Sequence, residues 1–533
     1  MSTNLKTKRA SRKAAGNRAA FSRNGNHANA GSVAGLPAKG ITTDLLAELV
    51  PSLKAAKPAR ILIVGCGVKI HFPWAKACEI YASAIRETKA ALGSQSFNVV
   101  TAPLPFEDPD ELIPFLNQQL AQGVDGLILF HATYTAGEIG SQLGRWLNDH
   151  PVPFLSWSIP EPKTASGRLE SNSLCCQNFL LNIFHRLDVK YAWLNAPTDA
   201  SAHATLGRFG RSVLARARML HGRVLHIGGS RVTAFYDGET DELAVMKRFG
   251  LRFDRIDLEV AFQHARKFSE KTLRQLRDVI VKSPKCQLND VPDAQMFQTL
   301  RLGLAALDMA AQRGYIGCVI KSWPELIDQY GCTTDGAVSM LNDIGLCTAE
   351  EGEMNGLLSS LTMHLLSEGR AVPTMMDLSQ WDDARNRIGV WHCGASPTRW
   401  LKQGTRFEAR KHSILENADP KTAVGLMLEF LLELGPATVL RYQSPDAGRA
   451  FVFEGELLDT PLTFRGNYCE LQPSAPHTAS QIMNSIMSRG LDHHWSLGFG
   501  HWKQDLAMLH HWLGVENLAI GNADEKSGLS IHA

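Results

Sequence analysis

The sequence predicts an α/β protein with two doubly wound α/β domains, followed by a C-terminal antiparallel β-rich domain. Three observations support this: the chain has 533 residues, too many for one core; buried-type strands alternate with helices through its first two thirds; and short alternating stretches follow residue 379. We expect a tail at residues 1–40 and domains at 41–188, 189–378 and 379–533.

The first predicted domain contains short apolar runs that alternate with helical segments. Such runs are typical of strands buried on both faces of a parallel sheet. Strands are expected at residues 60–65, 97–100, 126–130 and 152–156, and helices at 73–92 and 108–122. The turn at 65–67 lacks the third glycine of a dinucleotide fingerprint, so no nucleotide cofactor is expected.

The second and third domains are predicted from the same signals. In the second domain, strands are expected at 223–228 and 317–321, helical signals at 241–249, 257–283 and 355–369, and an apolar strand at 372–376. In the third domain, alternating stretches at 437–442 and 450–453 predict strands, and residues 505–513 predict a helix.

Composition places the chain among globular proteins. Its hydrophobic fraction is 44% and its charged fraction 20%. No run reaches the 18 or so apolar residues of a membrane span. None of the ten cysteines forms a CxxC pair, and Cys175 and Cys176 are interpreted as small buried hydrophobes. We therefore expect a soluble, cytoplasmic protein with no membrane partner.

The net charge of +2 conceals an uneven distribution. Residues 1–43 contain eight Lys or Arg and no acid, so the remainder has 47 basic and 53 acidic residues. The tail is rich in Ala, Ser, Gly and Asn without an apolar period, which predicts a disordered, solvated extension. A nucleic-acid arm or a cleaved transit peptide is the less favoured alternative.

An acidic motif is the first candidate functional feature. Glu350, Glu351 and Glu353 precede the predicted helix at 355–369, and Asp377 closes the apolar strand at 372–376. Acids at a helix start also serve as ordinary caps. Carboxylates at a strand end and a nearby helix start can nevertheless converge on one point, as a divalent cation requires.

Histidines near glycine-rich turns supply candidate nitrogen ligands. They are His392, His493, His494 and His501. A single histidine is more often structural than a ligand, but four of them in a chain with converging acids favour a metal site.

Together these motifs carry a family resemblance. The segment Glu-Gly-Glu-Met-Asn-Gly at 351–356, the strand end at Asp377, the His-Cys-Gly turn at 392–394 and the segment His-Trp-Ser-Leu-Gly-Phe-Gly-His at 494–501 resemble the L-fucose isomerase family, related to L-arabinose isomerases. Weaker similarities lie at 321–325 and 435–441. The resemblance covers roughly residues 60–520 in order.

The resemblance implies a fold, a cofactor and site residues. It implies two α/β domains with a β-rich third domain, a homo-oligomer (trimer or hexamer), and Mn²⁺ or another hard divalent cation bound by Glu351, Asp377 and His494. Glu350 competes with Glu351, and His493 with His494, as alternative ligands. The candidate substrate residues are Lys69, His71, His392, Trp495 and His501, the first two reaching a neighbouring subunit's sugar.

The implied reaction interconverts an aldose and a 2-ketose. A divalent cation would polarise the carbonyl and stabilise the negative charge that forms on the oxygens. Glu351 and Asp377 would serve as ligand and as general base and acid. A fucose- or arabinose-type sugar or a derivative is expected, and Lys321 and Arg441 leave room for an acidic group on it.

Two other functions remain open. A non-catalytic sugar-binding protein would need no acids at 351 and 377. A metal-dependent lyase or hydrolase acting on a carbohydrate derivative would use the same ligands. A nucleic-acid partner is not expected.

Overall fold

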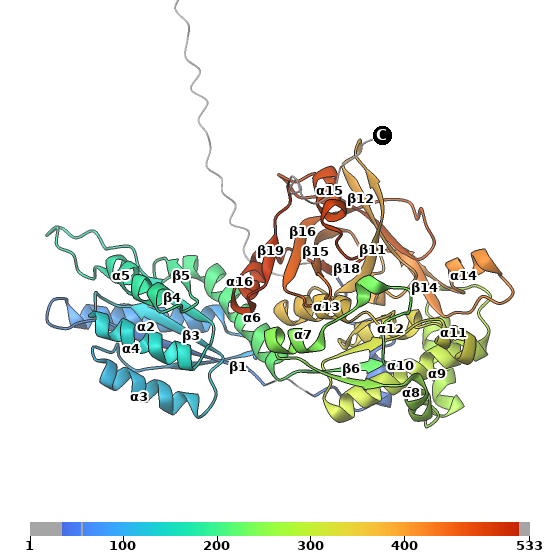
Figure 1. Cartoon of the computed structure of the whole chain (residues 1–533), viewed down its shortest axis with the longest axis horizontal. Coiled ribbons are helices and arrows are strands. Elements are labelled where there is room, and N and C mark those ends of the chain that lie inside the picture. The colour runs from blue at the N-terminus through green and yellow to red at the C-terminus, as the bar shows by residue number, and fades with distance from the viewer. Residues whose placement is uncertain (1–34, 55–56, 522–533) are drawn as a thin grey trace, which may run out of the picture. The chain divides into compact units, whose positions relative to one another are not determined.

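The computed structural model describes residues 35–54 and 57–521 (Figure 1). The basic tail predicted at residues 1–40 therefore lies outside the described residues, apart from its last six. A short helix, α1 (Thr43–Leu49), precedes the first sheet.

The first sheet has five parallel strands in the order β2-β1-β3-β4-β5. Its strands are β1 (Ala59–Cys66), β2 (Phe97–Thr101), β3 (Gly126–His131), β4 (Phe154–Ser158) and β5 (Ala192–Asn195). The helices are α2 (Trp74–Ala91), α3 (Pro109–Leu120), α4 (Gly137–Asp149), α5 (Ser173–Arg186) and α6 (His203–Leu220). The strand β5, beyond the boundary expected at residue 188, pairs with β4.

Both faces of this sheet are covered by helices, as the apolar run of β1 predicts. Ile61 and Ile63 share a core cluster with α2 and α6, whereas Leu62 and Val64 share another with α3, α4 and α5. Successive residues of a strand point to opposite faces, so a continuous apolar run requires cover on each side. Asp108 caps α3 by accepting a hydrogen bond from the Asp110 N–H.

A second parallel sheet has the order β10-β9-β6-β7. Its strands are β6 (Arg223–Ile227), β7 (Arg252–Ile256), β9 (Gly317–Ile320) and β10 (Cys347–Ala349). The helices of this part are α7 (Glu242–Phe249), α8 (Leu258–Ala265), α9 (Glu270–Val281), α10 (Asp293–Arg313), α11 (Glu325–Tyr330), α12 (Asp335–Asp343) and α13 (Met354–Leu366). The helical signals at 257–283 form two helices, because Ser269 caps a new one by accepting from the Thr272 N–H.

The third sheet has ten strands in the order β19-β16-β15-β18-β11-β12-β17-β14-β13-β8, and β16 also pairs with β17. These strands are β8 (Cys286–Leu288), β11 (Thr374–Asp382), β12 (Arg387–His392), β13 (Phe407–Arg410), β14 (Met427–Leu431), β15 (Gly435–Tyr442), β16 (Arg449–Leu458), β17 (Asn467–Pro473), β18 (His494–Phe499) and β19 (Glu516–Leu518). The accompanying helices are α14 (Ser413–Ala418), α15 (Ala479–Arg489) and α16 (Lys503–Leu513).

The prediction of an antiparallel C-terminal sheet is confirmed only in part, because this sheet is mixed. Six strands from β16 round to β17 form a closed antiparallel ring. Three further pairs are parallel: β8 with β13, β14 with β17, and β16 with β19. Parallel neighbours need a long connection, and each of these pairs joins strands that are far apart in sequence. The hydrophobic periodicity within a strand does not indicate which distant strand will pair with it in parallel.

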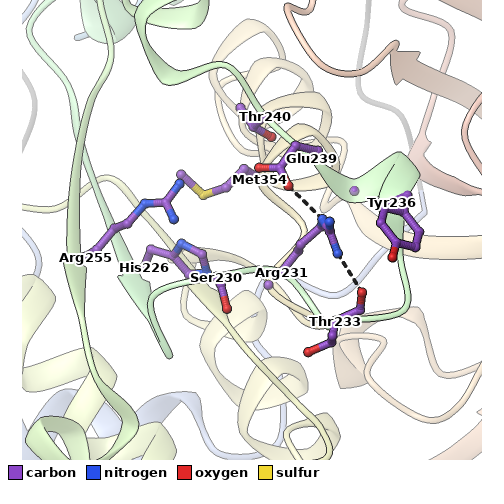
Figure 2. Close-up of a pocket in the computed structure, with 11 residues that line it drawn as sticks. His226, Ser230, Arg231, Thr233, Tyr236, Glu239, Thr240, Arg255 and Met354 are labelled. Carbon is purple, nitrogen blue, oxygen red and sulfur yellow. Dashed lines mark hydrogen bonds and ion pairs between the residues drawn. The ribbon is translucent and has the colours of Figure 1, made fainter.

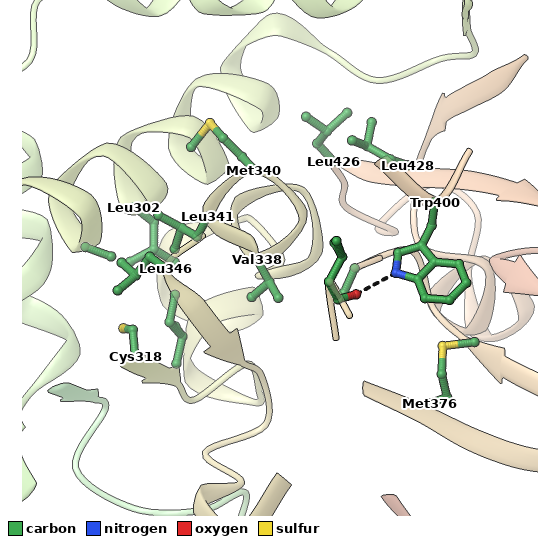
Figure 3. Close-up of a cluster of buried hydrophobic side chains, with 14 of the residues drawn as sticks. Leu302, Cys318, Val338, Met340, Leu341, Leu346, Met376, Trp400, Leu426 and Leu428 are labelled. Atoms are coloured by element: carbon green, nitrogen blue, oxygen red, sulfur yellow. Dashed lines mark hydrogen bonds between the residues drawn. The ribbon is translucent and has the colours of Figure 1, made fainter. Parts of the chain in front are cut away.

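The second and third sheets share one hydrophobic core. Leu302 of α10, Leu341 of α12 and Met376 of β11 belong to the same cluster, and the Trp400 indole donates a 2.6 Å hydrogen bond to the Val372 carbonyl within it (Figure 3). The helix α13 is buried along almost its whole length and packs against β9, β10, β15 and β18. The carboxyl edge of the second sheet therefore lies against the outer face of the strand ring.

In the described part of the chain, every helix is too short or too polar to cross a bilayer.

Candidate metal centre and active site

A strained turn holds Glu351 at the carboxyl edge of the second sheet. It joins β10 to α13, with φ of 62° at Glu351 and 67° at Gly352. The Gly352 N–H donates to the Ile320 carbonyl at 3.1 Å and the Val232 N–H to the Glu351 carbonyl at 3.0 Å. A Cβ on Gly352 would lie 2.4 Å from the Ser230 carbonyl oxygen. A left-handed glutamate is unfavourable, and such strain is typical of functional sites.

Strand pairing brings Asp377 and His494 to the same turn. They are directly opposed in the antiparallel pair of β11 and β18, so their side chains share the outer face of the ring. The His494 Nε2 lies 2.8 Å from the Glu351 Oε2 and 3.7 Å from the Asp377 Oδ1. His494 thus approaches both predicted acidic ligands, but the groups whose donor atoms all lie within 4.8 Å of one another are Glu351 with His493 and His494, and Asp377 with His392 and His494.

The facing atoms of Glu351 and His494 have the spacing of two ligands of a divalent cation, with Asp377 farther from His494. Glu351 Oε2 and Asp377 Oδ1 are buried and make no hydrogen bond within the described residues. Buried oxygens without a partner are costly, and a bound cation removes that cost. Two ligands about 2.1 Å from one ion at a right angle lie about 3 Å apart, close to the Glu351–His494 distance. Two carboxylates and one imidazole suit Mn²⁺ or a similar hard ion.

The surroundings of Glu351 favour its charged form. Burial opposes ionisation, but His494, His392 and the Trp323 indole outweigh it and hold the pKa of Glu351 at about 2. The indole N–H donates to Glu351 Oε1 at 3.5 Å. The carboxylate is therefore ready to bind a cation.

Glu350 points away from this centre, to His392. Its Oε1 lies 2.8 Å from His392 Nδ1, and its Oε2 accepts from the Thr334 hydroxyl at 2.9 Å. Burial lowers the pKa of His392, but the charges of Glu350, Asp377 and Glu351 raise it to about 10. The His392 ring lies 5.8 Å from that of His494. His392 is thus beside the centre, and the geometry favours Glu351 over Glu350 as the ligand.

His493 is held by Asp237, although one of its ring nitrogens lies within 4.8 Å of ligand atoms of Glu351 and His494. Its backbone N–H and its Nδ1 both contact Asp237 Oδ2, at 3.0 and 2.6 Å. Burial lowers the pKa of His493, but Asp237 outweighs it and raises that pKa. The Phe235 ring packs edge-on against both His493 and His494. The geometry therefore favours His494 over His493.

A buried ion triad missed by sequence reasoning supports both ligand segments. Arg441 on β15 donates to Glu353 at 2.5 and 3.1 Å, and to Asp492 at 2.8 and 2.6 Å. Glu353 follows Glu351 by two residues, and Asp492 precedes His494 by two. The Arg441 side chain is only 1% exposed and is held by both carboxylates, so Arg441 itself is not free to bind an acidic group on a sugar. Lys321 is similarly held, 2.6 Å from Glu325.

The other predicted substrate residues lie apart from the centre. Trp495 is on the inner face of the ring, packed against Phe451 and Phe453, because it neighbours His494 on the strand. His501 is half exposed, beside Glu454 and Glu456.

Lys69 and His71 lie in the loop after β1 of the first sheet, with Lys69 paired to Glu107. The described residues show no contact between these two and the metal centre, so their role depends on the predicted oligomer.

A cavity of about 300 Å³ adjoins the turn that holds Glu351 (Figure 2). Gly352 and Met354 line it from that side, Arg231 and Arg255 supply its cationic groups, and His226 and the acidic Glu239 also line it. The His226 ring is buried, and neither of its nitrogens has a hydrogen-bond partner among the described residues. Burial and the charge of Arg255 lower the pKa of His226 to about 3.

No family model matches the chain. Curated proteins of similar sequence do match it. A sulfoquinovose isomerase from Alkalicoccus urumqiensis is 26% identical over 73% of this chain and 84% of its own length. Sulfoquinovose isomerases from Priestia aryabhattai and Clostridium sp. (strain MSTE9) are 22% and 25% identical, over 76% and 80% of this chain and 88% and 92% of their own lengths.

Solved structures add nothing to this similarity. A glucose-galactose binding protein from Geobacillus stearothermophilus aligns with 59% of this chain and 92% of its own at 13% identity, with a TM-score of 0.15. That score is too low to indicate a shared fold. The chain is therefore a homologue of proteins named as sugar isomerases, and this similarity supports an aldose–ketose isomerase function.

Proposed function

We propose that the protein is a metal-dependent isomerase that interconverts an aldose and a 2-ketose by proton transfer. The approach of His494 to both Glu351 and Asp377 carries this proposal, together with the burial of the two carboxylate oxygens that face it. The curated homologues support the same reaction class. A bound Mn²⁺ or similar ion would supply Lewis-acid polarisation of the sugar carbonyl.

We assign the roles of Glu351 and Asp377 in the reaction from the exposure of their side chains. The Glu351 side chain is 14% exposed and that of Asp377 is 31% exposed. Asp377 is therefore the more accessible carboxylate, and we assign it the proton from C2, which it returns to C1 as the hydroxyl proton moves from O2 to O1. Glu351 and His494 would hold the cation in place. His392, charged next to Glu350, is positioned to donate to a sugar oxygen.

We further propose that the substrate is an aldose with an acidic group. Sulfoquinovose, in the names of the relatives, is a sugar that carries a sulfonate. The cavity beside the Glu351 turn supports such a substrate, because Arg231 and Arg255 both line it (Figure 2). Arg231 pairs with Glu239 and Arg255 with Glu242, so an acidic group would share or replace these partners. Arginine suits sulfonate and phosphate oxygens because its fork of N–H groups matches them.

Incubation with Mn²⁺ and an acidic aldose in deuterated water tests the reaction. The ketose product is expected to carry deuterium at C1, since the proton on the carboxylate exchanges with solvent before its return. Chelation by EDTA should abolish turnover, and added Mn²⁺ should restore it. Release of a smaller product would favour the lyase or hydrolase, and binding without turnover would favour the sugar-binding protein. Indifference to EDTA would contradict a catalytic ion.

Replacing Arg231 with Gln tests the acidic group. We expect KM for a sulfonated aldose to rise about tenfold, as loss of one charged hydrogen bond predicts, with little change in kcat. KM for a neutral aldose should stay the same. Arg274→Gln is the matched control, because this exposed arginine of α9 pairs with Glu270, stacks on Phe297 and does not line the cavity. Equal changes for sulfonated and neutral sugars would remove Arg231 from substrate recognition.

A further inference from the structure

A second cluster of ligand-type side chains lies in the first sheet, among residues that the proposed reaction does not use. Cys66 ends β1 and His131 ends β3, and the two are directly paired in the parallel ladder. Cys176 lies in the first turn of α5. All three are fully buried, and their donor atoms all lie within 4.8 Å of one another.

The His131 ring is oriented by a hydrogen-bond network. Its Nε2 lies 2.8 Å from the Ser156 hydroxyl of β4, and Gln177 Nε2 donates to the same hydroxyl at 3.2 Å and to the Ser156 carbonyl at 2.9 Å. A proton on Nε2 that is donated to Ser156 leaves a lone pair on Nδ1. That nitrogen lies 3.6 Å from Cys66 Sγ. An outer partner of this kind is typical of a metal-binding histidine.

The two thiols and the imidazole meet in a site with no exposure to water. Among the described residues, no Lys or Arg forms a hydrogen bond or ion pair with either thiol.

We propose that Cys66, His131 and Cys176 bind a thiophilic cation, Zn²⁺ or Cu⁺, at the carboxyl edge of the first sheet. Sulfur at about 2.3 Å and nitrogen at about 2.0 Å from a tetrahedral ion lie about 3.5 Å apart, which agrees with the Cys66–His131 distance. Thiolate and imidazole select these soft or borderline ions. The oxygen-rich centre at Glu351 selects hard ones, so the two sites take different metals.

The role of this ion would be structural. It would join the ends of β1 and β3 to the start of α5, and its full burial leaves no room for substrate. The inference does not depend on the isomerase reaction. The alternative is a pair of buried thiols hydrogen-bonded to a histidine, without metal.

Elemental analysis of the purified full-length protein tests the proposal. The wild type should contain about one equivalent of zinc or copper per chain, and the assay itself distinguishes the two ions. Cys66→Ser and Cys176→Ser should lose it. The matched control is Cys175→Ser, since Cys175 adjoins Cys176 on α5 but is exposed; this variant should keep the metal.

A spectroscopic readout covers the case in which the serine variants fail to fold. Wild-type protein produced with Co²⁺ in place of Zn²⁺ should show a thiolate-to-cobalt charge-transfer band, which an oxygen-rich centre cannot produce. The proposal would be overturned if the wild type contained no more zinc or copper than Cys66→Ser. It would also be overturned if Cys176→Ser contained as much metal as Cys175→Ser. A wild type that lacks copper and shows no such band would overturn it as well.

Discussion

Replacing Glu351 with Gln, or Asp377 with Asn, is expected to lower kcat by about 10³-fold or more, within the range for loss of a general base or of a catalytic ion. Each amide keeps the size of the side chain but removes its negative charge. At Glu351 the change weakens binding of the cation, which Glu351 would share with His494, 2.8 Å away. At Asp377 it also removes the proposed acceptor of the C2 proton.

The two variants should differ in metal content. Glu351→Gln is expected to lose bound Mn²⁺, whereas Asp377→Asn should retain more of it, because the Asp377 carboxylate lies farther from His494, at 3.7 Å. Initial rates of ketose formation and elemental analysis measure both effects, and circular dichroism confirms the fold. Glu456→Gln is the control, since this half-exposed carboxylate lies on β16 beside His501. Near wild-type turnover in either variant would remove that residue from the mechanism.

Replacing Arg441 with Met should lower the free energy of unfolding by about 3–5 kcal/mol, because it leaves the buried Glu353 and Asp492 carboxylates without their partner. All three side chains are at most 6% exposed. A loss of activity larger than the loss of stability alone would cause is also expected. Glu353 and Asp492 each lie two residues from a proposed metal ligand, so their displacement shifts the ligands. Arg441 is thus a positioning residue for both ligand segments.

Urea unfolding of wild-type and variant protein measures the change in stability, and initial rates of ketose formation measure the change in activity. The Kd for Mn²⁺ measures the effect on the ligand segments. Arg274→Gln breaks an exposed pair and should cost at most about 0.5 kcal/mol. A Glu353→Gln, Arg441→Met, Asp492→Asn triple variant removes the unpaired charges and should be more stable than Arg441→Met alone. If it also recovers full Mn²⁺ affinity, the triad has no positioning role.

Much of the fold could be predicted from local pattern. The strand β1 and the helix α3 appear where the apolar run and the Asp-Pro cap predicted them. These signals are local, because burial on one or both faces and the capping of free N–H groups act within a few residues. The parallel pairs of the third sheet left no such signal, since their partners are set by the path of the chain between them.

The candidate site divides in the same way. Sequence alone determined that acids at 351 and 377 and an imidazole at 494 are candidates for one centre. Tertiary structure decided between neighbours: a left-handed turn directs Glu351 and not Glu350 to His494, and the pairing of β11 with β18 places Asp377 opposite His494. It also enclosed Arg441 and brought Cys66, His131 and Cys176 together. The physical reason is that strand register and turn geometry fix the direction of each side chain. The residues that they join lie tens to hundreds of positions apart in the sequence, so local pattern does not link them.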